Sequence, residues 1–132
     1  MAFIDHFSLG VADLGPAGRF YDVLLATLGA RRLFEERDVI AYGTHPREGL
    51  FVINLPLDPA RPVVPQNGFH VCFTAADRAA VEAFHAAGLA AGGRDNGAPG
   101  YRPEYAPDYY GAFVIDPDGN HLGVVARIAP EA

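Results

Sequence analysis

Two stretches of the sequence decide the fold: residues 6–30, HFSLGVADLGPAGRFYDVLLATLGA, and residues 70–94, HVCFTAADRAAVEAFHAAGLAAGGR. They align without a gap at a constant offset of 64 residues, and 7 of the 25 aligned positions are identical. The identities include His6 with His70, Asp13 with Asp77 and Phe20 with Phe84. Because a repeat of this length marks a duplicated structural unit, the sequence predicts two related modules.

Each repeat opens with an alternating run that predicts a β-strand, at residues 3–11 and 69–74. In both runs every second side chain is apolar, which indicates one face packed under a helix and a second, more polar face. His6 and His70 occupy equivalent places on the polar faces. We therefore expect their imidazoles to face each other across one shared hollow.

A helix is predicted after each of these strands. The first runs from Asp13 to Gly29, with a proline in its opening turn and apolar residues at i, i+4 and i+8. The second starts at Thr74 or Asp77 and ends at the glycine pair of residues 92–93, because glycine commonly terminates helices.

Three short strands complete each half of the chain. We predict them at residues 32–35, 39–42 and 50–55, and again near 91–94, at 112–115 and at 121–127. Between the last two strands, the sequence DPDG at residues 116–119 has the composition of a tight turn. The pattern as a whole predicts an α+β fold made of two βαβββ modules.

The predicted organisation is one domain over residues 1–132. Its parts are module one at 1–55, a proline-rich linker at 56–67, module two at 68–128 and a C-terminal tail at 129–132. Prolines recur at every third position of the linker, which is the period of a polyproline II helix. We therefore expect a stiff, extended spacer between the modules.

The composition argues against several classes of function. The 10 basic residues are scattered and face 16 acidic ones, so the formal charge of −6 disfavours nucleic acid, whose phosphates need a cationic stripe. The single cysteine excludes an internal disulfide. No apolar run approaches the roughly 18 residues that a membrane-spanning helix needs. We expect a protein of the bacterial cytoplasm, with no membrane partner.

The sequence resembles the vicinal-oxygen-chelate superfamily, the group of glyoxalases, bleomycin-resistance proteins and extradiol dioxygenases. The likeness covers almost the whole chain and is carried by IDHFSLGVADL at residues 4–14, GFHVCF at 68–73 and YYGAFVIDPDGNHLGVV at 109–125. The resemblance implies a cupped, incompletely closed mixed sheet with the helices outside. It also implies a small organic molecule in the concave pocket and a homodimer.

In that superfamily two first-strand histidines and two acids usually surround a divalent metal. Carried over position by position, the histidines are His6 and His70, whereas Asn54 and Gly123 stand where the acids are expected. One hypothesis is therefore a metal-dependent lyase, isomerase or dioxygenase of glyoxalase type. Its Fe, Ni, Zn or Mn ion would be held by the two histidines, with water, substrate oxygens or Glu104 completing the shell.

The alternative hypothesis is a metal-free protein of the same fold that binds or sequesters a small molecule, as in the drug-resistance branch. In that case Gly123 leaves room for the ligand. Cys72 shares a strand face with His70, but neighbours at i and i+2 point along the strand, so we interpret Cys72 as a small buried hydrophobe and not as a nucleophile.

Residues 92–110 form a second candidate feature, because the segment is too long and too rich in glycine, proline and tyrosine to be only a connector. Either it contributes aromatic and polar groups to a ligand pocket or it packs as a flap over the open sheet edge. The predicted pocket residues are Asn54, Cys72, Tyr101, Arg102, Tyr105, Tyr109, His121 and Gly123.

Overall fold

The structure is a computed structural model that describes residues 3–131. A strand, a helix and three further strands occur twice along the chain. The elements are β1 (His6–Gly10), α1 (Leu14–Ala26), β2 (Arg31–Glu36), β3 (Val39–Gly43), β4 (Leu50–Asn54), β5 (Val71–Thr74), α2 (Arg78–Ala90), β6 (Arg94–Tyr101), β7 (Tyr109–Ile115) and β8 (His121–Arg127). We refer to β1–β4 with α1 as module one, and to β5–β8 with α2 as module two.

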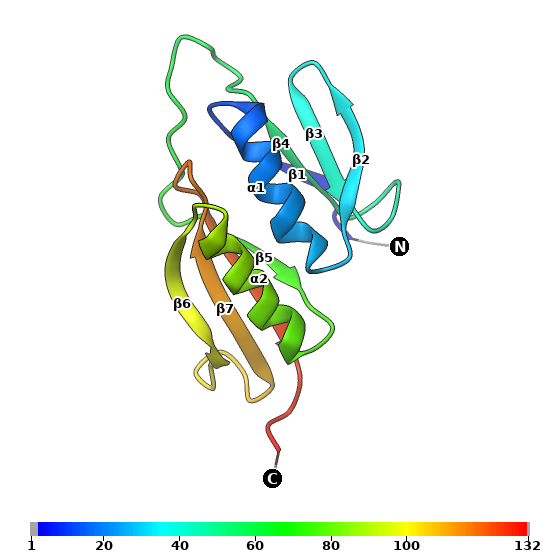
Figure 1. Cartoon of the computed structure of the whole chain (residues 1–132), viewed down its shortest axis with the longest axis vertical. Helices are drawn as coiled ribbons and strands as arrows, with labels where there is room; N and C mark the ends of the chain where they lie inside the picture. Colours follow the sequence, from blue (N-terminus) through cyan, green and yellow to red (C-terminus); the bar gives the residue numbers. More distant parts are fainter. Residues whose placement is uncertain (1–2, 132) are drawn as a thin grey trace.

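Each module forms a four-stranded mixed sheet, in the order β1-β4-β3-β2 or β5-β8-β7-β6 (Figure 1). In both sheets the first strand pairs in parallel with the last, and the other neighbours are antiparallel. A parallel pair needs a long crossover connection, and the helix of each module lies within it. The predicted α+β fold of two βαβββ modules with open sheets is confirmed.

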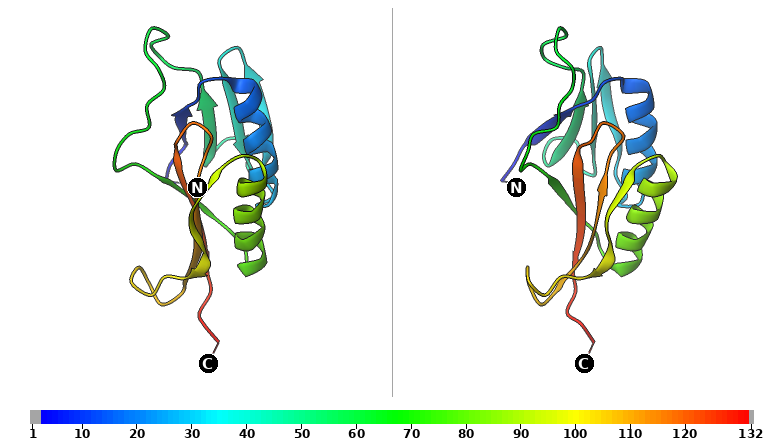
Figure 2. Two further views of the ribbon diagram at one scale, coloured as in Figure 1. Left: turned by 60° about the vertical axis from the view of Figure 1, so that its left-hand side comes forward. Right: turned by 90° about the vertical axis from the view of Figure 1, so that its left-hand side faces the viewer.

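The two helices lie on the same side of the molecule, and each covers one face of its own sheet (Figure 2). The opposite faces carry no helix, and the linker between the modules arches away from the body on that side (Figure 2). Each module therefore keeps one open sheet face, and these faces hold the polar residues of the first strands.

Both helices begin at the predicted aspartates. The Asp13 side chain accepts a hydrogen bond of 2.9 Å from the backbone N–H of Gly15, and Asp77 accepts one of 2.8 Å from that of Ala80. Such caps satisfy N–H groups that have no partner inside the helix. After α1 the chain turns at Gly29, whose positive φ of 78° is a conformation that glycine adopts without strain.

The modules meet through their helix-covered faces. The rings of Phe51 in β4 and Phe73 in β5 lie 5.2 Å apart, and Phe73 also contacts Phe84 of α2 at 5.9 Å. On the other side, Phe51 packs against Tyr21 of α1 at 5.0 Å. Edge-to-face and tilted pairs at these separations add to the free energy gained by burying the rings. This packing leaves β1 and β5 in separate sheets.

A buried hydrogen-bond network also joins the modules. The Tyr21 hydroxyl in α1 donates to Asp116 Oδ2 at 2.5 Å, and Asn120 donates to the same carboxylate at 2.9 Å and to the backbone oxygen of Gly10 at 3.2 Å. Burial and the adjacent carboxylate raise the pKa of Tyr21 well above its usual value. The DPDG turn that carries Asp116 is confirmed by the bond from Gly119 N–H to the Asp116 carbonyl at 2.9 Å.

Replacing Tyr21 by phenylalanine removes one donor and leaves a buried carboxylate oxygen with less compensation. We expect Tyr21→Phe to lower the free energy of unfolding by about 1–3 kcal/mol, measured by urea denaturation. The matched control is Tyr105→Phe, the same chemical change at a residue that is 62% exposed. We expect that control to change stability by less than about 0.5 kcal/mol; equal effects of the two substitutions would contradict the role of the network.

One predicted strand was misplaced. The strand expected near residues 91–94 is β6, which runs from Arg94 to Tyr101, so the segment after α2 is mostly sheet and not a flap. Its pairing with β7 shifts register between Asp95 and Gly97 and again between Gly97 and Gly100. Because of these two β-bulges and of the glycine and proline residues within it, β6 shows no regular alternation of polar and apolar residues by which the sequence could predict it.

The linker is also not a continuous extended spacer. The backbone N–H of Arg61 donates to the carbonyl of Asp58 at 3.1 Å, and the Asp58 side chain accepts from Ala60 N–H at 3.0 Å. These bonds form a turn, because an Asp side chain readily binds the backbone two residues on. The proline period therefore predicted an extended linker throughout and missed this turn.

Candidate functional site

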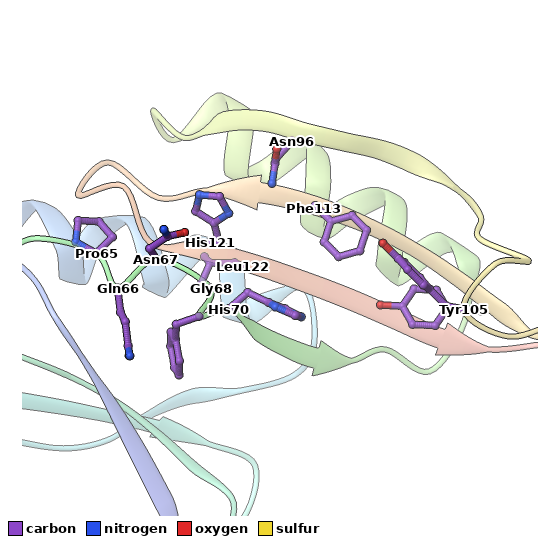
Figure 3. Close-up of a pocket in the computed structure, with 12 residues that line it drawn as sticks. Pro65, Gln66, Asn67, Gly68, His70, Asn96, Tyr105, Phe113, His121 and Leu122 are labelled. Carbon is purple, nitrogen blue, oxygen red and sulfur yellow. The ribbon is translucent and has the colours of Figure 1, made fainter.

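The open face of module two contains a pocket of about 760 Å³. Figure 3 shows its side chains on the side of the sheet opposite α2. The residues that matter most for its chemistry are His70, Asn96, Tyr105, Tyr109, Phe113 and His121. Amides of Gln66 and Asn67 add polar groups at one end. No Asp, Glu or Arg belongs to the lining that residues 3–131 provide, so the pocket combines aromatic rings with neutral donors and acceptors.

His70 and His121 lie next to each other in this pocket. β5 pairs in parallel with β8 and brings Val71 opposite Leu122, so the two histidines precede a paired position on adjacent strands. Both residues are exposed on the open face, and Figure 3 shows both rings in the pocket. The sequence predicted each histidine separately, but their pairing depends on the strand order within the module.

Phe113 fills the space above Gly123. β7 and β8 pair Phe113 directly with Gly123. A side chain at position 123 would meet ring atoms Cε1 and Cδ1 of Phe113 at 3.0 and 3.1 Å, and the Cys72 sulfur at 3.3 Å. The expectation that Gly123 leaves room for ligand is therefore wrong, because an aromatic ring occupies that room. Phe113 was not among the predicted pocket residues, and only the cross-strand register identifies it.

Tyr109 lies at the far end of the pocket from His121. Its ring packs edge-on against Tyr105 at 5.1 Å, and the guanidinium of Arg127 lies 4.9 Å from its centroid. Burial, with the thiol of Cys72 beside the hydroxyl, raises the pKa of Tyr109 to about 12. The phenol therefore stays protonated at neutral pH and can act as a hydrogen-bond donor.

Cys72 is exposed on the open face, so its interpretation as a buried hydrophobe was wrong. Its sulfur lies 3.7 Å from the Tyr109 hydroxyl. Neighbouring groups nevertheless crowd the thiol, and this desolvation raises the pKa of Cys72, whereas the contact with Tyr109 acts in the opposite direction. The thiol is therefore predominantly protonated at neutral pH.

The raised pKa predicts a slow reaction of Cys72 with iodoacetamide, because the thiolate is the nucleophile. At about pH 7.5 we expect alkylation to be slower in the folded protein than in the same chain unfolded in urea. Tyr109→Phe removes the contact that lowers the pKa and should slow the reaction further. Mass spectrometry of timed samples measures both rates, and faster alkylation of the folded protein would contradict the assignment.

Arg102 lies beside the pocket, just after the end of β6. Its Nη1 donates to the carbonyls of Gly100 at 2.8 Å and Gly111 at 3.2 Å, and its Nη2 donates to that of Ala98 at 2.7 Å. Its guanidinium carbon lies 5.5 Å from the Phe113 ring centroid. Of the three predicted pocket residues Arg102, Tyr105 and Tyr109, the two tyrosines line the pocket, whereas Arg102 lies outside its lining and next to Phe113.

Tyr101 and Glu104, two other candidates, lie elsewhere. Tyr101 packs against the hydrophobic core on the helix-covered face, with its ring 5.0 Å from Tyr110. Alternation along β6 explains this, because Tyr101 points away from the face that its neighbours Gly100 and Arg102 occupy. Glu104 is exposed in the loop after β6 and does not line the pocket.

His6 and Asn54 line a different hollow, on the open face of module one, with a volume of about 600 Å³. Three carboxylates share it, those of Asp5, Glu36 and Asp38. Nδ1 of His6 pairs with Asp5 Oδ1 at 2.5 Å. Asn54 donates to the carbonyl that follows it at 2.8 Å, while its Oδ1 is buried and has no hydrogen-bond partner among the described residues.

The expected hollow shared by His6 and His70 does not form within one chain. The two rings line separate hollows, because the modules pack through their helix-covered faces and β1 and β5 belong to different sheets. Sequence reasoning identified equivalent positions correctly but assumed that equivalent residues of one chain also meet in space.

The donor set of one chain does not fit a catalytic divalent metal, which usually needs three protein ligands. Within residues 3–131, no three His, Cys, Asp or Glu side chains are grouped so that they could hold a metal ion. The Phe113 ring fills the place of the second acid, and Asn54 offers only a neutral amide oxygen. The assignment of His6 and His70 as ligands stays a prediction.

Comparison with known proteins identifies the family. No protein-family model and no curated protein matches the sequence. The chain is 34% identical to a glyoxalase/bleomycin resistance protein from Albidiferax ferrireducens T118, with a TM-score of 0.87 over 96% of this chain and 100% of that one. A glyoxalase-related enzyme from Fulvimarina pelagi has the same fold at 19% identity and a TM-score of 0.72, covering 96% and 88% of the two chains.

Lactoylglutathione lyase from Agrobacterium tumefaciens also shares the fold, at 18% identity and a TM-score of 0.64 over 96% and 94% of the two chains. Paired βαβββ modules with open sheets define the vicinal-oxygen-chelate class of proteins. Within it, this chain belongs to the glyoxalase/bleomycin resistance protein family. Neither helix found in residues 3–131 is long and apolar enough to cross a membrane.

Introducing at position 123 the acid that the resemblance predicts there tests the role of Phe113. We expect Gly123→Glu to lower the free energy of unfolding by about 1–3 kcal/mol, because the new side chain overpacks against Phe113 and Cys72. Phe113→Ala removes the ring that the new side chain would contact. The double substitution should therefore lower the free energy of unfolding by less than the sum of the two single substitutions. Urea denaturation of the four proteins measures this coupling, and strict additivity would contradict the contact.

Proposed function

We propose that this protein binds a small organic molecule in the module-two pocket without a metal ion. The observation that carries the proposal is the Phe113 ring above Gly123, which puts an apolar surface where the family places a metal-binding acid. The former metal position thus supports an aromatic wall. The proposal corresponds to the drug-resistance branch and not to the metal-dependent enzymes.

The pocket has the features of small-molecule sites. Its volume of about 760 Å³ is in the range of such pockets, and aromatic rings stand among a few neutral polar groups. Phe113 can exclude water from an apolar ligand body, while the imidazoles of His70 and His121 can fix the position of a polar substituent.

We also propose that the protein is a homodimer. Large apolar side chains are exposed around both hollows: Phe34 (44%) and Leu57 (96%) at the module-one hollow, and Phe69 (41%) at the module-two pocket. A second copy would cover such residues, which single soluble chains rarely expose together. Placing module one of one subunit against module two of its partner would bring the hollow of His6 to that of His70.

The metal-dependent alternative has one observation in its favour. In that dimer the buried, unpartnered Oδ1 of Asn54 would accompany His6 and His70, and an amide oxygen is a weak metal ligand. Zinc, nickel and iron prefer imidazole and carboxylate or thiolate ligands, so a site with two imidazoles and one amide would bind them weakly.

A thermal-shift screen combined with metal titration tests the proposal. A ligand present at 100 times its Kd stabilises the folded protein by about 2.7 kcal/mol and so raises the Tm by about 10 °C. We expect an organic binder to do so, and the shift to fall in Phe113→Ala but not in His6→Ala. We expect Fe(II), Ni(II), Zn(II) and Mn(II) all to bind more weakly than millimolar.

Stoichiometric metal binding that is lost in both His6→Ala and His70→Ala would replace this proposal with the metal-dependent enzyme. Light scattering coupled to size-exclusion chromatography measures the subunit mass and tests the dimer separately. A monomer with no metal affinity would still leave the module-two pocket as the binding site.

A further inference from the structure

The geometry points to a planar anion as the bound molecule, an aromatic or conjugated carboxylate or enolate whose negative group pairs with Arg102. This inference rests on the proposed function, since it names the class of molecule that the module-two pocket takes. It depends on four features of the site: a fixed guanidinium, unused donors on that group, the absence of carboxylates around it, and a wall of aromatic rings.

The Arg102 guanidinium is held in place by the backbone. Its three hydrogen bonds run to the carbonyl oxygens of Ala98, Gly100 and Gly111, all on β6 and β7. Glycine makes this position accessible, because a side chain at Gly97 or Gly100 would meet the guanidinium nitrogens at 3.1 or 3.3 Å. A charged group fixed in this way loses little further conformational entropy when a ligand binds.

The guanidinium keeps donors for a ligand. Arginine has five N–H bonds, and the three bonds to backbone carbonyls leave Nε–H and one hydrogen of Nη2 without an acceptor among residues 3–131. Planar arginine forks bind carboxylates and similar anions with charge-assisted hydrogen bonds, which are stronger than neutral ones.

No negative charge of the described chain neutralises Arg102. Among the described arginines, Arg32, Arg78 and Arg127 have a carboxylate within ion-pair distance. Arg102 is one of several that have none within residues 3–131, and it differs from those others in that backbone carbonyls hold its guanidinium beside the pocket. A partly buried, uncompensated cation is costly unless a ligand supplies the opposite charge.

A solely structural role explains these observations less well. Filling the space over glycines needs volume and hydrogen bonds to carbonyls, which a neutral amide side chain supplies without a charge. An anionic ligand, in contrast, is favoured where acids are absent, because nearby carboxylates would repel it. The pocket next to Arg102 is correspondingly free of Asp and Glu among its described lining residues.

The aromatic wall selects for a planar, electron-rich ligand. Phe113 lies 5.5 Å from the Arg102 guanidinium and Tyr109 lies 4.9 Å from that of Arg127. A cation over an aromatic ring is attracted by the negative face of that ring. The ring then attracts a second cation less strongly. A flat, anionic ligand can therefore stack with an offset on Phe113 while its negative group pairs with Arg102.

Three naphthalene compounds of one shape test the charge preference: 2-naphthoate, the neutral 2-naphthamide and the cationic 2-naphthylmethylammonium. Isothermal titration at about pH 8, where histidine side chains are ordinarily neutral, gives each Kd. We expect 2-naphthoate to bind about tenfold more tightly than 2-naphthamide. Arg102→Gln should weaken naphthoate binding about tenfold and change the Kd of the amide less than about twofold.

Arg37→Gln is the matched control, because it removes the same charge from an exposed residue between β2 and β3 of module one. We expect it to leave all three Kd values within about twofold, since charges farther apart than about 10 Å are screened at moderate salt. If Arg102→Gln fails to fold, the wild-type protein still provides the test. Raising the salt concentration should weaken binding of 2-naphthoate and not of 2-naphthamide.

The outcomes separate this inference from the proposed function. Equal binding of the three compounds, unaffected by Arg102→Gln, would overturn the anion assignment while leaving a small-molecule pocket in place. Failure of all three to bind the wild-type protein would overturn the planar-anion class, and the thermal-shift screen would then decide independently whether the pocket binds other compounds. Tighter binding of the cation would also contradict the inference.

Discussion

The contact of Phe51 with Phe73, together with the hydrogen bonds of Asp116, determines how the two modules are joined, and the rest of the molecule follows from that joint. It uses the helix-covered faces, so the opposite sheet faces stay open and separate. Two hollows result where one shared cup was expected. Any site that needs residues from both hollows at once must therefore be completed by a second subunit.

Within module two, one cross-strand pair determines what the pocket can do. Phe113 lies opposite Gly123 and forms an aromatic wall at the position where the resemblance predicts an acid. Glycine fits this arrangement closely, since a Cβ atom at position 123 would lie 3.0 Å from the ring and the ring would have to move by a few tenths of an ångström. The ring over Gly123 is the observation on which the proposed metal-free binding of an organic molecule depends.

The sequence predicted those features that depend on neighbours along the chain. Strand alternation, the repeat and the capping residues Asp13 and Asp77 were sufficient for both helices and for the equivalence of His6 with His70. What it could not predict depends on pairing across strands or between modules. The bulges around Gly97 concealed β6, and the Phe113 contact and the separation of the two histidines follow from register and long-range packing.

The two open faces differ in charge although the two modules share one repeated pattern. The module-one hollow contains the carboxylates of Asp5, Glu36 and Asp38, whereas the module-two pocket has none among its described lining and borders the cation of Arg102. If the pocket binds an anion as proposed, the first hollow would repel that molecule and the second would attract it, because charges in a concave, partly desolvated site interact more strongly than in water. The proposal therefore implies one anion site per chain. In a dimer that sets the two hollows face to face, the carboxylates of the acidic one would weaken binding of an anion beside Arg102, so dimerisation of this kind and anion binding would oppose each other.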